Sequence, residues 1–191
     1  MGRGRLRGRG GGGALVTAER DAGAGTGNLG DSETVVAEDG RRYAFADHNC
    51  FACGRDNPIG MRLKIEIGDG MARTTWIADD NHVGWSDKLH GGIIATLLDE
   101  VMAWAPSSFD SWAVTAEMSV RYRSPAAPGE ELTAVGRVME RRRRIYEVTG
   151  EVRAADGRLV AEGRGRYLGA SPRQKAALKE QYGVAAGVGG E

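Results

Sequence analysis

The chain has 191 residues, of which 41% are hydrophobic, so it is long enough for one domain with an apolar core. Its 26 basic and 26 acidic residues give zero formal net charge, so no overall field attracts nucleic acid or a membrane surface. No apolar run approaches the roughly 20 residues that cross a bilayer, the N-terminus lacks the apolar segment of a secretory signal, and two cysteines make no disulfide framework. We therefore expect a cytoplasmic protein that binds neither nucleic acid nor membrane.

Residues 1–40 are predicted to form a disordered tail. The stretch begins MGRGRLRGRGGGG, in which arginines alternate with small residues as in RNA-binding arms. Six acidic residues before position 40 cancel this charge, which favours a solvated tail over a nucleic-acid contact. The folded domain is expected at 41–169, followed by a flexible, weakly helical tail at 170–191.

Residues 47–60, DHNCFACGRDNPIG, are rich in turn-forming residues and contain a Cys50-x-x-Cys53 pair. With His48 the pair matches part of a metal site, but structural zinc takes four ligands and the chain has no second cysteine pair. A redox pair would open a helix after a strand, whereas Asn57-Pro58 follows here. We therefore predict a structural entry loop, with no metal and no cofactor.

Two short strands are predicted next, at 61–67 and 72–78. The sequence Gly68-Asp69-Gly70 between them is typical of a hairpin turn. Residues 79–89 then form a loop.

The stretch His90–Ala105, HGGIIATLLDEVMAWA, is predicted to be a mostly covered helix that ends at Pro106, because apolar residues recur at helical spacing over about half its circumference. Its two glycines leave N–H groups open at the positive end of the helix dipole, where negative charge is stabilised. Two turns further on, Asp99 or Glu100 supplies a carboxylate that can activate water or attack an acyl group. The helix thus carries both halves of a reaction centre.

Four more strands are predicted, at 114–123, 131–141, 145–154 and 159–168, before a weak helix at 172–182. Alternation in the first of them places Val114, Ala116, Met118, Val120 and Tyr122 on one face, and Thr115, Glu117, Ser119, Arg121 and Arg123 on the other. The order of elements predicts an α+β fold, an antiparallel sheet of about five to six strands wrapped around one long helix. Its edges and second face predict a homo-oligomer, a dimer or a dimer of dimers.

The HGG start with an acid nine residues after the histidine resembles the central helix of hotdog-fold acyl-CoA thioesterases, of the PaaI-like 4HBT type. CFACGRDNPIGMRL at 50–63 resembles their entry segment, and AVTAEMSVRYRSPA at 113–126 resembles the strand after the helix. The resemblance covers roughly residues 50–168. It implies the hotdog fold and hydrolysis of an acyl-CoA thioester to free acid and CoA, with no cofactor besides the CoA of the substrate.

The resemblance also implies roles for single residues. Asp99, from the opposed subunit, would act as general base or nucleophile, and the backbone N–H of Gly91 or Gly92 would form the oxyanion hole. Thr115 would hold the attacking water, or it is an ordinary β-branched strand residue. His90 would help to bind substrate, or its imidazole caps the helix. Glu100 would then be an interface acid or one that supports Asp99.

Many relatives carry an asparagine six residues before the histidine, where this chain has Gly84. The water-orienting amide would then be absent, or replaced by Asn81 or His82.

Cations should line the path of the CoA phosphates. Candidates are Arg121, Arg123 and Ser124 near the end of the first strand after the helix, and Arg143 in the next hairpin turn. The alternative is that these are solvated charges at strand ends.

Two other functions remain open at this stage. A non-catalytic acyl-CoA-binding or sensing protein could use the same fold, since fold does not determine function. A nucleic-acid-binding protein could use the Arg-Gly tail and the run at 141–144. The carboxylate beside the HGG start favours the hydrolase.

Overall fold

The computed structural model describes residues 34–36, 42–44 and 48–181. Every described residue belongs to the unit formed by residues 31–191. Most of the predicted tail at 1–40 lies outside the described residues, as does the end of the predicted C-terminal tail, so the domain boundaries stay predictions. Within 31–47, strand β1 (Thr34–Val36) pairs with strand β2 (Arg42–Ala44).

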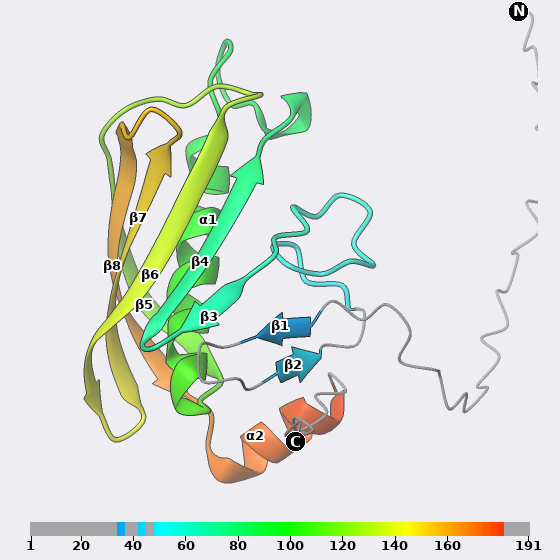
Figure 1. The fold of residues 1–191 in the computed structure, drawn as a ribbon, viewed down its shortest axis with the longest axis vertical. Coiled ribbons are helices and arrows are strands. Elements are labelled where there is room, and N and C mark those ends of the chain that lie inside the picture. Colours follow the sequence, from blue (N-terminus) through cyan, green and yellow to red (C-terminus); the bar gives the residue numbers. More distant parts are fainter. Residues whose placement is uncertain (1–33, 37–41, 45–47, 182–191) are drawn as a thin grey trace, which may run out of the picture. The chain divides into compact units, whose positions relative to one another are not determined.

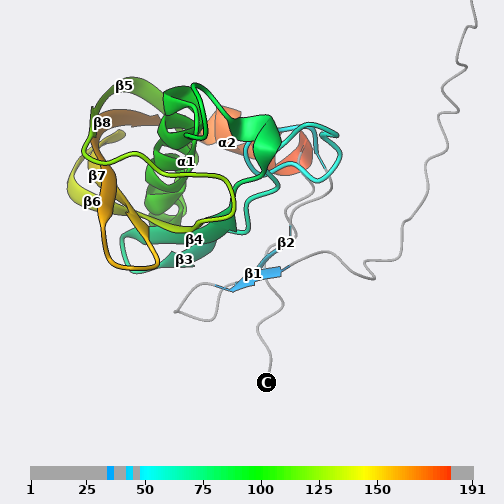
Figure 2. The same cartoon turned by 90° about the horizontal axis from the view of Figure 1, so that it is seen from above.

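A six-stranded antiparallel sheet forms the main layer, in the order β3-β4-β6-β7-β8-β5. Its strands are β3 (Glu66–Gly68), β4 (Met71–Ile77), β5 (Ala113–Tyr122), β6 (Glu131–Arg142), β7 (Ile145–Ala154) and β8 (Leu159–Gly169). The sheet curves around one long helix, α1 (Gly91–Trp104), as Figures 1 and 2 show. The expected hotdog-type architecture is therefore confirmed.

Helix α1 begins at the predicted place and buries the predicted stripe. Its buried residues are Ile94, Leu97, Leu98, Val101 and Met102. The predicted end at Pro106 needs a small correction, because a 3-10 helix, η2 (Ala105–Phe109), continues the chain with its proline in the first turn, where the missing N–H costs nothing. A further 3-10 turn, η1 (Asp80–His82), precedes α1, and helix α2 (Pro172–Gln181) follows the sheet. None of the described helices is long and apolar enough to cross a membrane.

The helix lies unusually close to the middle of the sheet. A Cβ atom placed on Gly136 of β6 would lie 2.3 Å from the carbonyl oxygen of Val101, and one on Gly150 of β7 would lie 2.8 Å from the Met102 side chain. Glycine at these positions lets the α1 backbone and Met102 occupy space that a methyl group would fill. Met102 is fully buried there, between helix and sheet.

Two sequence predictions differ from the structure in physically informative ways. The predicted strand at 61–67 pairs only over Glu66–Gly68, although Met61, Leu63 and Ile65 are buried in the predicted alternation. The two faces predicted for the first strand after the helix are also wrong at its start. A β-bulge between Thr115 and Glu117 of β5 reverses the alternation there.

Gly136→Ala should lower the free energy of unfolding by about 3 kcal/mol, because its methyl group must displace the α1 backbone. Urea denaturation monitored by circular dichroism measures the change. Gly129→Ala is the matched control: its Cβ would meet no atom within 4 Å, so only its positive φ of 82° opposes the change, at about 1 kcal/mol. Equal losses in the two variants would contradict a tight helix-to-sheet contact.

Candidate active site

Asp99 lies on α1 where the helix faces strands β5 and β8. One of its carboxylate oxygens, Oδ1, accepts a hydrogen bond from the Thr115 hydroxyl at 2.7 Å and another from the Tyr167 hydroxyl at 3.0 Å. Among the residues that the structure describes, none hydrogen-bonds to the other oxygen, Oδ2. The carboxylate is thus oriented by two donors and presents one oxygen for chemistry.

The bulge in β5 explains how Thr115 reaches this carboxylate. Thr115 pairs with Tyr167 of β8, and Glu117 already pairs with Arg166, so Ala116 is the extra residue. Thr115 therefore points toward α1, while Val114, predicted to share a face with Met118, is 65% exposed. Bulges often re-aim side chains in this way beside functional sites.

Tyr167 is the one member of this group that the sequence did not single out. It is fully buried, and burial followed by the charge of Asp99 raises the pKa of its phenol, so it stays a neutral hydrogen-bond donor. The sequence feature that could have pointed to Tyr167 is its position on one face of β8 after three small residues, Ala161, Gly163 and Gly165.

The start of α1 distinguishes the two glycines. His90 is the N-cap, and its Nδ1 accepts a hydrogen bond from the Gly92 N–H at 2.8 Å. The N–H of Gly91 has no hydrogen-bond partner among the described residues, while the Gly91 carbonyl accepts from the Tyr122 hydroxyl at 2.9 Å. The imidazole therefore acts as the helix cap, and Gly91 rather than Gly92 offers an open N–H at the positive end of the dipole.

An open pocket of about 730 Å³ lies beside this helix start and is lined by residues 84–91. At Gly84, a Cβ would lie 2.9 Å from His90 Cα, so the chain has no room for a side chain in the present loop conformation. Asn81 and His82 were suggested as replacements for the asparagine that many relatives carry at the position of Gly84. Asn81 is exposed, and His82 packs edge-on against Trp76, with Nδ1 2.8 Å from Asp79 Oδ1.

The predicted phosphate-binding residues lie at two ends of the sheet. Arg123 and Ser124 follow β5, where Tyr122 pairs with Ala161, and Arg123 forms an ion pair with Glu162 at 2.5 Å. Arg143 sits in the β6–β7 turn, next to the pairing of Ile145 with Leu168. The two ends are seven residues apart along β8, about 23 Å.

Arg121 points away from α1, into a cavity of about 520 Å³ on the outer face of the sheet. Within one chain, then, these cations do not form a single site.

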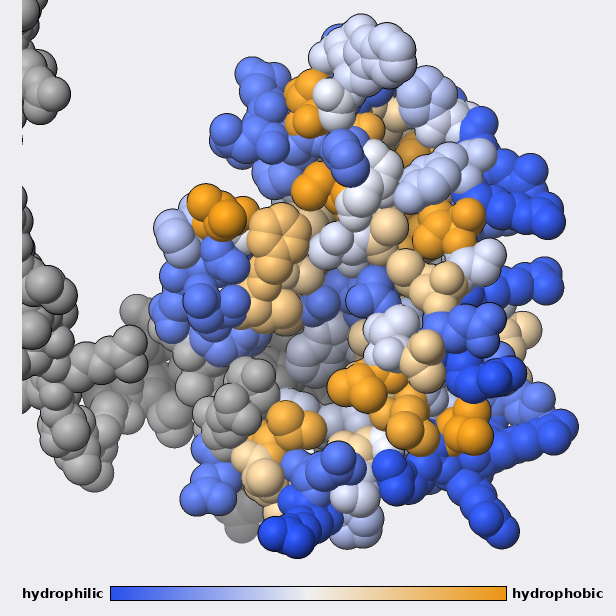
Figure 3. Space-filling model, turned by 180° about the vertical axis from the view of Figure 1, so that it is seen from behind, coloured by the Kyte–Doolittle hydropathy of each residue, from blue (hydrophilic) through white to orange (hydrophobic). Residues whose placement is uncertain are grey.

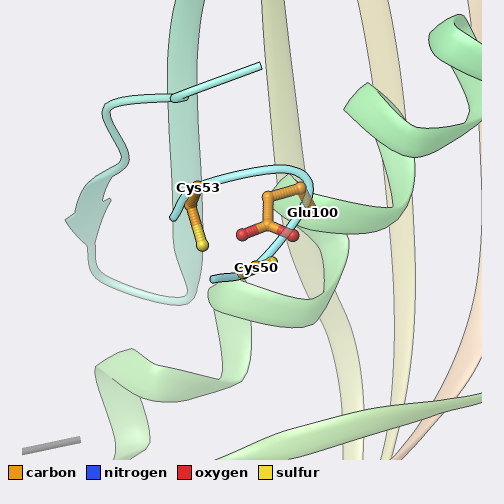
Figure 4. Close-up of side chains that lie close together, drawn as sticks. All are labelled: Cys50, Cys53 and Glu100. Atoms are coloured by element: carbon orange, nitrogen blue, oxygen red, sulfur yellow. The ribbon is translucent and has the colours of Figure 1, made fainter. Parts of the chain in front are cut away.

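Glu100, the neighbour of Asp99, faces a different part of the molecule. Its carboxylate lies beside the entry loop, with Cys50 Sγ, Cys53 Sγ and a Glu100 oxygen all within 4.8 Å of one another (Figure 4). Burial raises the pKa of Glu100 to about 7. The Cys53 thiol donates to Cys50, which lowers the pKa of Cys50 to about 5, while that bond and burial raise the pKa of Cys53.

The chain is similar in sequence to known thioesterases and to a putative esterase. The family model of the thioesterase superfamily matches residues 87–161, from the loop before α1 to β8. A putative esterase of Archaeoglobus fulgidus is 28% identical over 101 residues, which are 53% of this chain and 66% of that protein. Human acyl-coenzyme A thioesterase 13 is 29% identical over 109 residues, 56% of this chain and 78% of that protein.

Solved structures share the fold. A conserved protein from Pseudomonas aeruginosa is 33% identical, with a TM-score of 0.54 over 58% of this chain and 90% of that one. A Streptococcus mutans protein bound to acetyl CoA is 21% identical, with a TM-score of 0.56 over 61% of this chain and 95% of that one, which shows a common fold alone.

Proposed function

The chain belongs to the thioesterase superfamily, with the PaaI-like hotdog fold, and we propose that it hydrolyses an acyl-CoA thioester to a free acid and CoA. The observation that carries the proposal is the Asp99 carboxylate, held by the Thr115 and Tyr167 hydroxyls with Oδ2 left open. A protein that only bound the ester would have no need of an oriented carboxylate in this position. The relatives named acyl-coenzyme A thioesterase support the choice of CoA.

In the proposed reaction, the thioester carbonyl oxygen accepts a hydrogen bond from the Gly91 N–H, where the helix dipole stabilises the developing oxyanion. Oδ2 of Asp99 either removes a proton from water as the water attacks the carbonyl carbon, or attacks that carbon itself to give a mixed anhydride. In both routes the carbon–sulfur bond breaks and CoA leaves as a thiolate. In the first route the proton that Asp99 took from water passes to this thiolate. In the second route a water molecule then hydrolyses the anhydride, which gives the free acid, regenerates the Asp99 carboxylate and supplies the proton for the thiolate. Thr115 and Tyr167 position the carboxylate, and no cofactor takes part.

The two halves of this site cannot come from one chain. Gly91 and Asp99 are eight residues apart on the same helix, about 12 Å along its axis, which is too far for both to act on one carbonyl group. In the proposed reaction a second copy of the chain supplies one of them.

Strand β5 shows how that copy would bind. It has ten residues and lies at the edge of the sheet, where no other described strand pairs with its outer side, and its Val114 and Tyr122 are 65% and 55% exposed. On the side where β5 lies, apolar side chains interrupt the hydrophilic surface (Figure 3). Such an edge invites pairing with a second strand.

Antiparallel pairing of two β5 strands about a two-fold axis completes the site. Asp99 contacts Thr115 near the start of β5, and Gly91 contacts Tyr122 near its end. If the axis passes near Met118 and Ser119, the start of one β5 lies opposite the end of the other, so Asp99 of one chain comes near the helix start of its partner.

The same two-fold arrangement brings together the separated cations. Arg143 lies at the Asp99 end of its own chain, and Arg123 lies at the Gly91 end of its own chain. Each proposed site would then be flanked by Arg143 of one protomer and Arg123 of the other, and we propose these two for the CoA phosphates. The two free cysteines fit the reducing cytoplasm, where we propose that the protein acts.

Asp99→Asn should reduce thiol release from acyl-CoA esters by about 100-fold or more while ester binding is retained, because the amide keeps the shape but loses the base and nucleophile. Release is measured over a panel of short, long and aromatic acyl-CoAs. Asp156→Asn, in the β7–β8 turn, is the control that should leave turnover unchanged. A wild-type protein that binds these esters and cleaves none would establish the sensing function instead.

Gly91→Pro should lower kcat by about 100-fold or more, because proline removes the one open N–H of the proposed oxyanion hole. Gly91 is the first helical residue, where proline is tolerated, and His90 before it is already extended at φ −64° and ψ 133°. Gly91→Ala is the matched control, since alanine places its Cβ in the same contact with Tyr122 but retains the N–H. Equal activity in the two variants would remove Gly91 from the oxyanion hole.

Mixing the two inactive variants tests the shared site. A co-expressed pair of Asp99→Asn and Gly91→Pro chains should recover about a quarter of wild-type turnover, because half of the dimers are mixed and each of these has one intact site. The turnover of each separately purified variant provides the baseline. A mixture of the two purified variants, assayed before their dimers exchange subunits, is a second baseline. No recovery from a verified heterodimer would show that both groups act within one chain.

A further inference from the structure

The entry loop and helix α1 bring three metal-binding groups together. Cys50 and Cys53 come from the loop, and Glu100 comes from the middle of the helix, about fifty residues later in the chain. Their two sulfur atoms and one carboxylate oxygen all lie within 4.8 Å of one another, and both sulfurs face the carboxylate (Figure 4). Ligands around one zinc ion with bonds of 2.0 to 2.3 Å lie about 3.5 Å apart, so small side-chain movements suffice for all three to bind one ion.

The loop is built tightly around its cysteines. The Gly54 N–H donates to the Cys50 carbonyl at 3.0 Å and closes the turn that carries both cysteines. A Cβ on Gly54 would lie 2.3 Å from the His48 carbonyl oxygen, so the turn requires glycine directly after the second cysteine.

One oxygen of the Glu100 carboxylate is held within helix α1. Glu100 Oε1 accepts a hydrogen bond from Trp104 Nε1 at 2.7 Å, one turn further along α1. Among the residues that the structure describes, no cationic side chain pairs with this carboxylate, and its remaining neighbours are the two thiols and Asp99. A carboxylate and two sulfur atoms in a partly buried setting are three donor groups placed so that one divalent cation could bind them together.

We propose that Cys50 Sγ, Cys53 Sγ and the Glu100 carboxylate bind one Zn²⁺ ion, with a water molecule in the fourth position. Two sulfurs and one oxygen suit zinc rather than magnesium or calcium, which take oxygen ligands. Binding releases the thiol protons to solvent and leaves the oxidation states of the metal and both sulfurs unchanged. The sequence argued against zinc because it lacks a second cysteine pair; Glu100 adds a third protein ligand, and the proposed water completes the four.

The site would tie the entry loop to the helix that carries Asp99. Adjacent residues on an α-helix point about 100° apart, so Glu100 faces the loop while Asp99 faces the sheet. The ion therefore lies outside the proposed reaction centre and stabilises the position of α1. The proposal does not depend on the proposed hydrolysis, because metal binding is measured without substrate.

The test uses the full-length, untagged chain, reduced and stripped of metal with a chelator. Zinc added in competition with a chromophoric chelator should bind at one ion per chain with Kd below about 1 µM and raise Tm by at least about 5 °C. Cobalt(II) added in its place should give the sulfur-to-metal charge-transfer band and the strong visible absorption of a tetrahedral thiolate site.

Variants assign the ligands. Cys50→Ala and Cys53→Ala should each abolish the cobalt charge-transfer spectrum or weaken zinc binding by at least about 100-fold. Glu100→Gln, whose amide oxygen can still accept from Trp104, should weaken it by about 10-fold or more. Asp99→Asn and Glu117→Gln are controls that should bind zinc like the wild type, and circular dichroism verifies that each variant is folded.

Three results would overturn the proposal. The first is zinc binding weaker than about 1 µM by the reduced wild-type protein. The second is undiminished binding by folded Cys53→Ala or Glu100→Gln. The third is a Cys50–Cys53 disulfide in protein taken directly from cells under thiol-blocking conditions, which would make the pair a redox element instead.

Discussion

The close approach of α1 to the inner face of the sheet determines where the functional groups lie. Gly136 and Gly150 leave room for the helix backbone and for Met102, so the helix settles against the middle strands. At this separation, Asp99 comes within hydrogen-bond distance of a threonine on β5 and a tyrosine on β8. A helix held further from the sheet would leave this carboxylate without either donor.

A second constraint is that one chain carries an unfinished sheet and an unfinished site. In the part of the chain that the structure describes, strand β5 pairs with β8 alone, and the Gly91 N–H lies about 12 Å along the helix axis from Asp99. A two-fold pairing of β5 would extend the sheet and complete the site. Asp99 contacts the start of β5 and Gly91 contacts its end, so antiparallel pairing brings Asp99 of one chain near Gly91 of the second chain. The pairing of two β5 strands would then both form the dimer and complete the proposed site for thioester hydrolysis.

Asp99 and Glu100 are neighbours on α1, but their carboxylates contact different parts of the molecule. Asp99 faces two hydroxyl donors on the sheet, which leave it ready for proton transfer or attack. Glu100 faces two sulfur atoms and an indole N–H, with burial that raises its pKa to about 7. The rotation of about 100° per residue separates the two, so that one turn of helix connects the proposed reaction centre with the proposed zinc site.

The sequence by itself determined the order of α1 and the strands of the six-stranded sheet, the buried stripe of α1 and the α+β class, because hydrophobic periodicity reports burial directly. It did not predict β1, β2 or the two 3-10 turns. Together with the HGG resemblance it also singled out Asp99, Thr115 and the helix start.

Only the tertiary structure decided which groups meet. Tyr167 reaches Asp99 from 68 residues away, and Glu100 meets cysteines that precede it by about fifty residues. The bulge in β5 turns Thr115 toward the helix against simple alternation, and the histidine cap leaves Gly91 as the open donor. Contacts between distant segments, and a single extra residue in a strand, leave no period in the sequence from which they could be predicted.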